Sequence, residues 1–205
     1  MSILHYFGND PDKRARFIFD FIAPVYGSID KGLQDSFAKA AGLLSENIPL
    51  KGLSVLDVGC GTGAWGAALQ HLGAVNICGV DMSPKMLKEA RKRHPDFCFT
   101  SSDARNIRKF DDNQFDIATA SYVLHGVKAD IRREILEEMK RLATKYVVIH
   151  DFYGKTPLFV QFLEFMERSD YKNFKRNFRR EMEELFNKTE IIATPDGTAL
   201  YIGFI

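Results

Sequence analysis

The nine residues VLDVGCGTG at positions 55–63 decide the fold of this chain. Apolar, strand-forming residues surround Asp57, glycine then recurs at every second position, and a helical pattern begins at Ala64. Glycine lets a chain leave a strand through a tight turn, and its backbone can approach a ligand closely because it has no Cβ. The stretch therefore predicts a strand, a loop that binds a nucleotide-type cofactor, and a helix, in that order.

Two kinds of cofactor are compatible with this loop. Gly61, Gly63 and Gly66 satisfy the G-x-G-x-x-G spacing of dinucleotide-binding loops, and Asp81 follows about where such proteins place a ribose-binding carboxylate. Asp57 argues against a dinucleotide, because a carboxylate at the end of the first strand would repel the two phosphate charges. S-adenosylmethionine suits Asp57 better, since it has no phosphate and carries a sulfonium and an ammonium group.

The loop strongly resembles the first motif of the class I S-adenosylmethionine-dependent methyltransferases. A second segment, FDFIAPVYG at 19–27, resembles the F-D-x-I-A-P-x-Y-D segment of the ubiquinone- and menaquinone-biosynthesis branch and its small-molecule relatives, although Gly27 replaces the aspartate. The resemblance covers about residues 16–151. It implies S-adenosylmethionine as cofactor, and it implies that Tyr26 lies over that cofactor. A core aromatic is the alternative role for Tyr26.

After Pro49 the apolar pattern alternates between strands and helices, which indicates βαβ units and a buried parallel sheet. The last two strands are separated by Pro195-Asp196-Gly197, which predicts a hairpin. We predict an α/β fold with a doubly wound, seven-stranded, mostly parallel sheet and an antiparallel last strand. The strands are predicted at 53–58, 76–80, 97–100, 115–120, 146–150, 189–193 and 198–204, and helices at 64–72, 83–93 and 130–143.

The chain is predicted to contain an N-terminal helical flap, residues 1–48, and a cofactor-binding core, residues 49–205. Helices are expected in the flap at 12–22 and 33–46. A further amphipathic helix is expected within 168–188, where Phe174, Phe178, Met182 and Leu185 recur at helical spacing. Its basic residues are either a lid for an acidic substrate or RNA, or a solvated face balanced by Glu181, Glu183 and Glu184.

Ligands of doubly wound sheets bind beyond the carboxyl ends of the strands. Asp57, Asp81 and Asp103 are predicted at the ends of three successive strands. Each could alone be a helix cap or a solvated loop residue, but together they indicate a cofactor site. Asp81 could accept hydrogen bonds from both ribose hydroxyls, and the family resemblance implies that Asp103 accepts one from the adenine amino group. The predicted cofactor contacts are Tyr26, Asp57, Gly59, Cys60, Gly61, Gly63, Asp81, Met82, Asp103, Ala104 and Ala120.

The segment ASYVLHGV at 120–127 resembles the family segment that faces the methyl group. Within it, His125 is the candidate base, because the unperturbed pKa of histidine is near neutrality. His150 and Asp151, at the end of the fifth strand, form a second candidate pair, and we assign His125 and Asp151 as the catalytic candidates. The alternative for the histidines is a packing role or a hydrogen bond to the backbone.

Composition limits the partners. The 205 residues include 28 lysines and arginines and 27 aspartates and glutamates, so the net charge of +1 gives no reason to expect nucleic acid or an anionic membrane as partner. No apolar run approaches the roughly 18 residues of a membrane span, and the N-terminus lacks a secretory signal. We therefore expect a cytoplasmic protein with a small-molecule substrate, and the oligomeric state stays open. The 3 cysteines are odd in number and lie in or beside predicted strands, which argues against a disulfide framework. We expect them to be buried small side chains, with a catalytic or metal-binding thiol as the alternative, and no metal site is predicted.

The predicted function is S-adenosylmethionine-dependent methyl transfer to a small molecule by in-line displacement. One alternative is methylation of RNA or protein. The Asn/Asp-Pro-Pro-Tyr type of signature for amino-group methylation is replaced here by ASYV at 120–123, which argues against base or glutamine methylation. A second alternative is a non-catalytic cofactor-binding protein that docks onto a partner.

Overall fold

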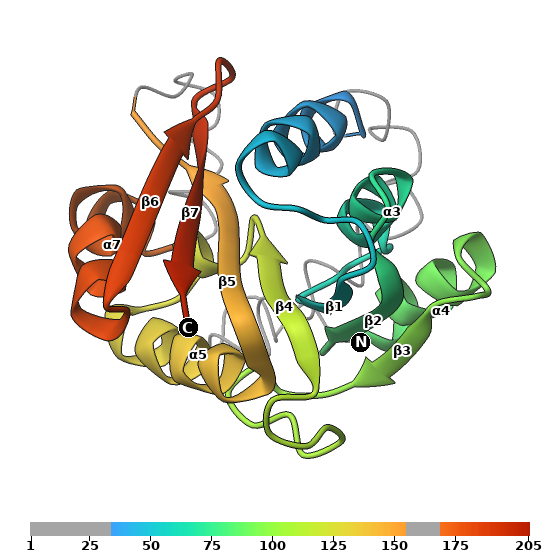
Figure 1. The fold of residues 1–205 in the computed structure, drawn as a ribbon. Coiled ribbons are helices and arrows are strands. Elements are labelled where there is room, and N and C mark those ends of the chain that lie inside the picture. Colours follow the sequence, from blue (N-terminus) through green and yellow to red (C-terminus); the bar gives the residue numbers. More distant parts are fainter. Residues whose placement is uncertain (1–33, 155–168) are drawn as a thin grey trace.

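The computed structural model describes residues 34–154 and 169–205. Its centre is a seven-stranded sheet of order β3-β2-β1-β4-β5-β7-β6 (Figure 1). Strands β1 to β5 are parallel, and β7 runs antiparallel to both β5 and β6. The strands are β1 Ser54–Val58, β2 Val75–Asp81, β3 Cys98–Ser101, β4 Phe115–Ser121, β5 Ala143–Phe152, β6 Lys188–Ala193 and β7 Thr198–Phe204. The predicted fold class is confirmed, including the antiparallel last strand.

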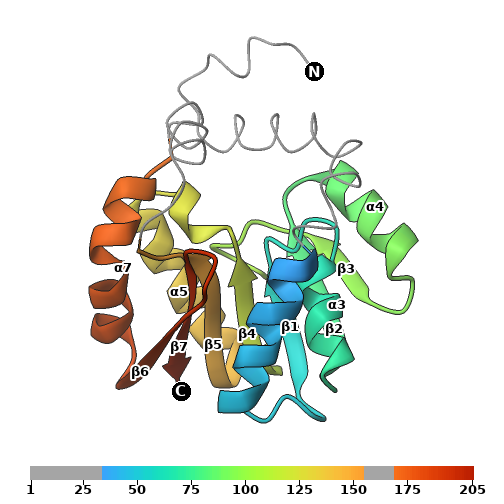
Figure 2. The same cartoon turned by 90° about the horizontal axis from the view of Figure 1, so that it is seen from above.

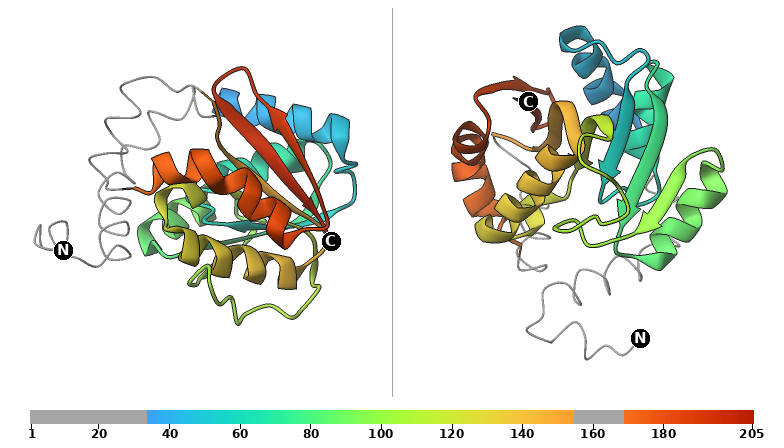
Figure 3. Two further views of the ribbon diagram at one scale, coloured as in Figure 1. Left: turned by 90° about the vertical axis from the view of Figure 1, so that its left-hand side faces the viewer. Right: turned by 60° about the horizontal axis from the view of Figure 1, so that its bottom comes forward.

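Helices cover both faces of this sheet, as the views from above and from the side show (Figures 2 and 3). A helix over residues 34–47 and helix α3 pack on one face, and helices α5 and α7 pack on the other. The helices are α3 Ala64–His71, α4 Pro84–Arg93, α5 Ala129–Leu142 and α7 Tyr171–Leu185, with a short 3-10 helix η1 at Leu124–Gly126. Most of the predicted N-terminal flap, including Tyr26, lies outside the described residues.

Helix α7 confirms the predicted amphipathic pattern. Phe174, Phe178 and Met182 are buried against the sheet. On the outer face, Arg179 pairs with Glu183 at 2.8 Å one helical turn further on. At this position the basic stretch has a solvated, charge-balanced face, as in the second of the two interpretations.

Glu181 does not belong to that outer face, so its predicted role was wrong. Its carboxylate accepts two hydrogen bonds of 2.7 Å from the guanidinium of Arg132 on α5, which is fully buried. Asp170, at the start of α7, accepts a third from the same guanidinium at 2.9 Å. Because a buried guanidinium must be paired, this interaction fixes α7 against α5.

Cys60, Cys78 and Cys98 are free thiols. Cys60 is buried in the loop after β1, whereas Cys78 and Cys98 are half-buried partners on β2 and β3. Burial as small apolar side chains is therefore complete for Cys60 and partial for the other two. Across residues 34–154 and 169–205, no helix is long and apolar enough to cross a membrane.

We predict that Glu181→Ala lowers the free energy of unfolding by about 3 kcal/mol, because it leaves the buried Arg132 with one carboxylate fewer. The matched control is Glu183→Ala, whose exposed pair with Arg179 should contribute less than about 1 kcal/mol. Urea unfolding monitored by circular dichroism measures both. Equal, small losses in the two variants would contradict the structural role assigned to Glu181.

Candidate functional site

The loop between β1 and α3 has the conformation that its glycines predict. Gly59, Gly61 and Gly63 adopt φ values of 72°, 51° and 83°, in the left-handed region that disfavours other residues. A Cβ at Gly59 would lie 2.5 Å from a methyl group of Val123. The amides of Gly59 and Cys60 both donate to the carbonyl of Val80, at 2.8 and 3.0 Å. The loop is therefore fixed against the end of β2.

Asp81 joins this loop to the next helix. One carboxylate oxygen accepts the amide N–H of Gly61 at 2.9 Å, and the other accepts that of Ser83 at 2.7 Å. Ser83 in turn caps α4, because its hydroxyl accepts the amide of Met86 at 3.2 Å. Asp81 thus has a structural role beside its predicted one. It also occupies the Gly61 amide, which a phosphate would otherwise use.

Asp57 lies at the end of β1 beneath the loop and is only 2% exposed. One of its carboxylate oxygens is buried and has no hydrogen-bond partner among the described residues. Burial raises the pKa of this carboxyl to about 7; the amide of Gly66 opposes the shift, and the charge of Asp81 adds to it. A cationic ligand would compensate this carboxylate, whereas a pyrophosphate would be repelled by it. The residues of the loop therefore fit S-adenosylmethionine and do not fit a dinucleotide.

The remaining predicted cofactor contacts are placed less directly. Asp103 forms an ion pair with Arg105 at 2.6 Å, and this hydrogen bond holds the pKa of its carboxyl below the usual range. Ala120 is fully buried in the core on the α5 side, so only its backbone could meet a ligand. Met82 and Ala104 are half-buried next to Asp81 and Asp103.

The two catalytic candidates are in direct contact. Nδ1 of His125 lies 2.7 Å from a carboxylate oxygen of Asp151, and both side chains are buried. The other carboxylate oxygen accepts the backbone N–H groups of Leu124 and His125 at 3.1 and 3.2 Å. The N–H of Phe152 donates to the first oxygen at 2.8 Å, so both oxygens of Asp151 act as acceptors here and His125 donates to it from Nδ1. Asp151 therefore sets both the position and the tautomer of the imidazole.

The side chains of the second candidate pair, His150 and Asp151, lie on opposite faces of the sheet. Neighbouring residues on a strand point to opposite faces of the sheet, and these two are consecutive on β5. His150 packs on the α3 side, where its ring stacks on Trp65 with centroids 5.3 Å apart. Its two nitrogens lie 2.9 Å from the hydroxyls of Ser121 and Thr198.

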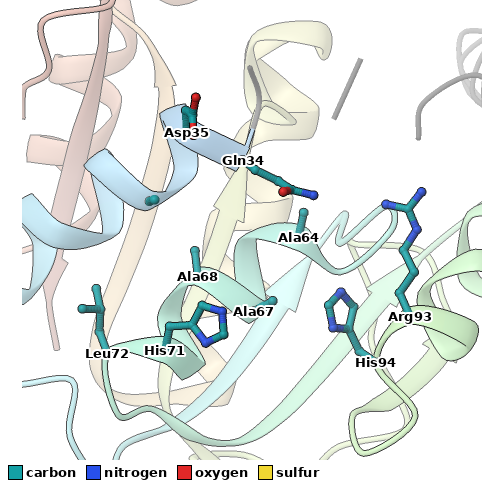
Figure 4. A pocket seen from close by; sticks show the side chains of 10 residues that line it. Gln34, Asp35, Ala64, Ala67, Ala68, His71, Leu72, Arg93 and His94 are labelled. Atoms are coloured by element: carbon teal, nitrogen blue, oxygen red, sulfur yellow. The ribbon is translucent and has the colours of Figure 1, made fainter. Parts of the chain in front are cut away.

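A groove of about 680 Å³ runs between the helix over 34–47, α3 and the end of α4. Figure 4 shows alanines of α3 along it, with Arg93 and His94 on the α4 side and Gln34 on the opposite side. None of the residues predicted for the cofactor or for catalysis lines this groove. The groove therefore lies outside the candidate site.

Asp57 should make the stability of the protein depend on pH. Its folded pKa of about 7 lies above its ordinary value of 3.8, so the folded state binds more protons between these values and loses stability as pH rises through them. We predict that the wild-type free energy of unfolding falls by on the order of 1–4 kcal/mol between pH 4 and 8 through this group. Asp57→Asn should remove most of that fall, as measured by urea unfolding at several pH values. The exposed Asp103→Asn is the control, and a fall unchanged in Asp57→Asn would contradict the assignment.

Comparison with known proteins agrees with the geometry of the loop. Residues 55–145 match a family model described as "Methyltransferase domain". The chain is 34% identical over 134 residues to a demethylmenaquinone methyltransferase of Paenarthrobacter aurescens, covering 64% of this chain and 51% of that protein. It is 35% identical over 136 residues to a 2-phytyl-1,4-naphtoquinone methyltransferase of Nostoc punctiforme, covering 61% of this chain and 57% of that protein. The chain thus spans little more than half the length of these curated relatives.

A solved structure shares the fold over nearly the whole chain. The magnesium protoporphyrin IX methyltransferase of Synechocystis PCC 6803 with bound S-adenosylmethionine superposes with a TM-score of 0.69 at 19% identity. The superposition covers 96% of this chain and 97% of that one. At this identity the likeness concerns the fold alone.

Proposed function

Because this chain belongs to the class I S-adenosylmethionine-dependent methyltransferases, we propose that it transfers a methyl group from S-adenosylmethionine to a small aromatic acceptor. The observation that carries the proposal is the buried, unpaired carboxylate oxygen of Asp57 beside the glycine loop. In bound form the cofactor supplies a methyl group activated by positive sulfur. We propose that it is held by Asp57, Asp81, Gly59, Cys60, Gly61, Gly63, Met82, Asp103, Ala104 and Ala120, and by Tyr26 from the N-terminal segment.

The names of the two relatives suggest the class of acceptor, a naphthoquinone with a long side chain. A ring carbon that receives an electrophilic methyl group must be electron-rich, so the reduced quinol is the competent form. The new bond joins the ring carbon to the methyl group, the sulfur–methyl bond breaks, and a ring proton is lost to a base. The enzyme's main contribution is alignment, which can remove roughly 7–11 kcal/mol of a barrier.

In this reaction His125 would be the base, acting through Nε2, and Asp151 would be its positioning residue. The 2.7 Å contact between Nδ1 and the carboxylate supports these roles, because it orients the ring and stabilises the imidazolium that proton uptake would form. The turn that carries His125 is held to Asp151 by two backbone hydrogen bonds.

The ion pairs on the surface of α7 bear on the class of substrate. We propose a small molecule as the substrate and no nucleic acid, since two of the three arginines of α7 are paired on the helix surface: Arg179 with Glu183 and Arg180 with Glu184. Cytoplasmic residence is the location that the sequence favours. Tight cofactor binding without transfer to any naphthoquinol would favour the non-catalytic alternative instead.

We predict methyl transfer from S-adenosylmethionine to 2-phytyl-1,4-naphthoquinol, or a short-chain analogue, and none to the oxidised quinone. His125→Ala should lower turnover about 10²–10⁴-fold while the affinity for S-adenosylhomocysteine is retained. The matched control is His71→Ala, an exposed histidine at the end of α3. The assay follows S-adenosylhomocysteine formation under anaerobic conditions. Full turnover in His125→Ala, or transfer to the quinone form, would contradict the proposal.

A further inference from the structure

Four side chains from three segments form a continuous hydrogen-bond chain on the α3 side of the sheet. The hydroxyl of Ser121 lies 2.9 Å from Nδ1 of His150. Nε2 of the same imidazole lies 2.9 Å from the hydroxyl of Thr198, which donates to Asp196 at 2.9 Å. His150 and Thr198 are buried, whereas Ser121, at the carboxyl end of β4, is half-buried. The chain therefore runs from the turn of the β6–β7 hairpin to the edge of the sheet where ligands bind.

The direction of every proton in this chain is set by Asp196. Although burial raises the pKa of its carboxyl, hydrogen bonds from Ser36, Thr194 and Thr198 lower it to about 2, so the group is an ionised acceptor. Thr194 also donates to this carboxylate, and its hydroxyl lies 2.5 Å from that of Thr198. The hydroxyl proton of Thr198 therefore points to Asp196 or to Thr194, and in both cases away from His150. The reverse direction would turn an oxygen lone pair toward a carboxylate and would be repulsive. Thr198 thus accepts from Nε2 of His150.

With its proton on Nε2, a neutral His150 has its lone pair on Nδ1. Burial lowers the pKa of this imidazole to about 4, so it is uncharged at neutral pH. Its ring is held by the stacked Trp65 and by edge contacts with Phe37 and Tyr122, with centroids 6.0 and 5.0 Å away. Nδ1 must therefore accept the hydroxyl proton of Ser121, and it does so from a fixed position.

The Ser121 hydroxyl is left with oxygen lone pairs only. Its bond to His150 is the one side-chain hydrogen bond it makes within residues 34–154 and 169–205. Thr119, two residues earlier on β4, is the strand partner of Asp57. Ser121 therefore lies on the same face as Asp57, about 7 Å further toward the ligand edge. A group that hydrogen-bonds to Ser121 there must bring its own proton.

We propose that Ser121 is a specificity-determining residue that accepts a hydrogen bond from an aromatic hydroxyl of the methyl acceptor, with His150 and Thr198 as positioning residues. This inference rests on the proposed function, and it names the feature of the substrate that the site selects. A quinol or phenol donates this bond, whereas a quinone carbonyl or an ether cannot. The site would therefore distinguish a reduced acceptor from its oxidised form.

A pair of stable probes tests the inference without relying on turnover. 1-Naphthol carries the hydroxyl proton and 1-methoxynaphthalene lacks it. Trp65 is the single tryptophan of the chain and stacks on His150, so its fluorescence reports binding of either probe in the presence of saturating S-adenosylhomocysteine. In the wild type we expect 1-naphthol to bind about tenfold or more tightly than the ether.

Substitutions then test whether this preference for 1-naphthol depends on the hydrogen-bond chain from Asp196 to Ser121. In Ser121→Ala and Thr198→Val, the ratio of the two probe affinities should fall to about one. Thr198→Ser keeps the hydroxyl and should keep the wild-type ratio. Thr189→Val is the matched control, because Thr189 is half-buried on β6 and is not part of the hydrogen-bond chain; it should keep the wild-type preference. Nitrogen-15 NMR of the wild type should show His150 as the neutral Nε2–H tautomer at pH 7.

Four results would overturn the inference. They are no preference for 1-naphthol in the wild type, a preference unchanged in Ser121→Ala, a His150 proton on Nδ1, or a loss of S-adenosylhomocysteine affinity in Ser121→Ala as large as the loss for 1-naphthol. The last would mean that Ser121 meets the cofactor's ammonium group instead. Methyl transfer to a naphthoquinol is measured separately, so failure of the proposed function and failure of this inference are distinguishable.

Discussion

The candidate site depends on a carboxylate that the fold buries without a full set of partners. Asp57 stands near the end of β1, next to the central strand β4, and one of its oxygens finds no donor in the described part of the chain. Burying a polar group in this way costs stability. Natural proteins accept such a cost mainly where a ligand later compensates it. The glycine loop above Asp57 lets the backbone approach a ligand closely. Its Gly61 amide is already bound to Asp81, so it does not attract a phosphate. The two features together favour a cation and disfavour phosphate.

The alternation of side chains along β5 separates two imidazole sites. Asp151 points to the α7 side and holds His125, whereas His150 points to the α3 side and holds Ser121. Both sites lie at the carboxyl ends of β4 and β5, on opposite sides of the sheet. In one site a carboxylate contacts the imidazole directly. In the other a threonine lies between the carboxylate and a buried, neutral ring. The first arrangement favours proton transfer, and the second favours a fixed hydrogen-bond direction.

Local sequence was enough to predict the strands, the glycine loop and the amphipathic face of α7, because each depends on periodicity or on conformations that glycine tolerates. It did not predict pairs between distant residues. The contact between Arg132 and Glu181, and the link from Asp196 to His150, join elements whose packing only the tertiary structure defines. The opposite directions of His150 and Asp151 do have a local signal, since consecutive strand residues face opposite sides. Asp81 was assigned to the cofactor alone because nothing local showed that it also binds the loop amide.

Membership of a fold family does not identify the acceptor, which depends on the site. The buried Asp57 carboxylate instead bears on the cofactor, because it selects a cationic ligand. Calorimetric titration of S-adenosylmethionine near pH 6.5, repeated in two buffers of different ionisation enthalpy, counts the protons released on binding. We predict a release approaching one proton in the wild type and almost none in Asp57→Asn, with no comparable binding of NAD to the wild type. Proton-independent binding in the wild type, or NAD binding of similar strength, would contradict the account.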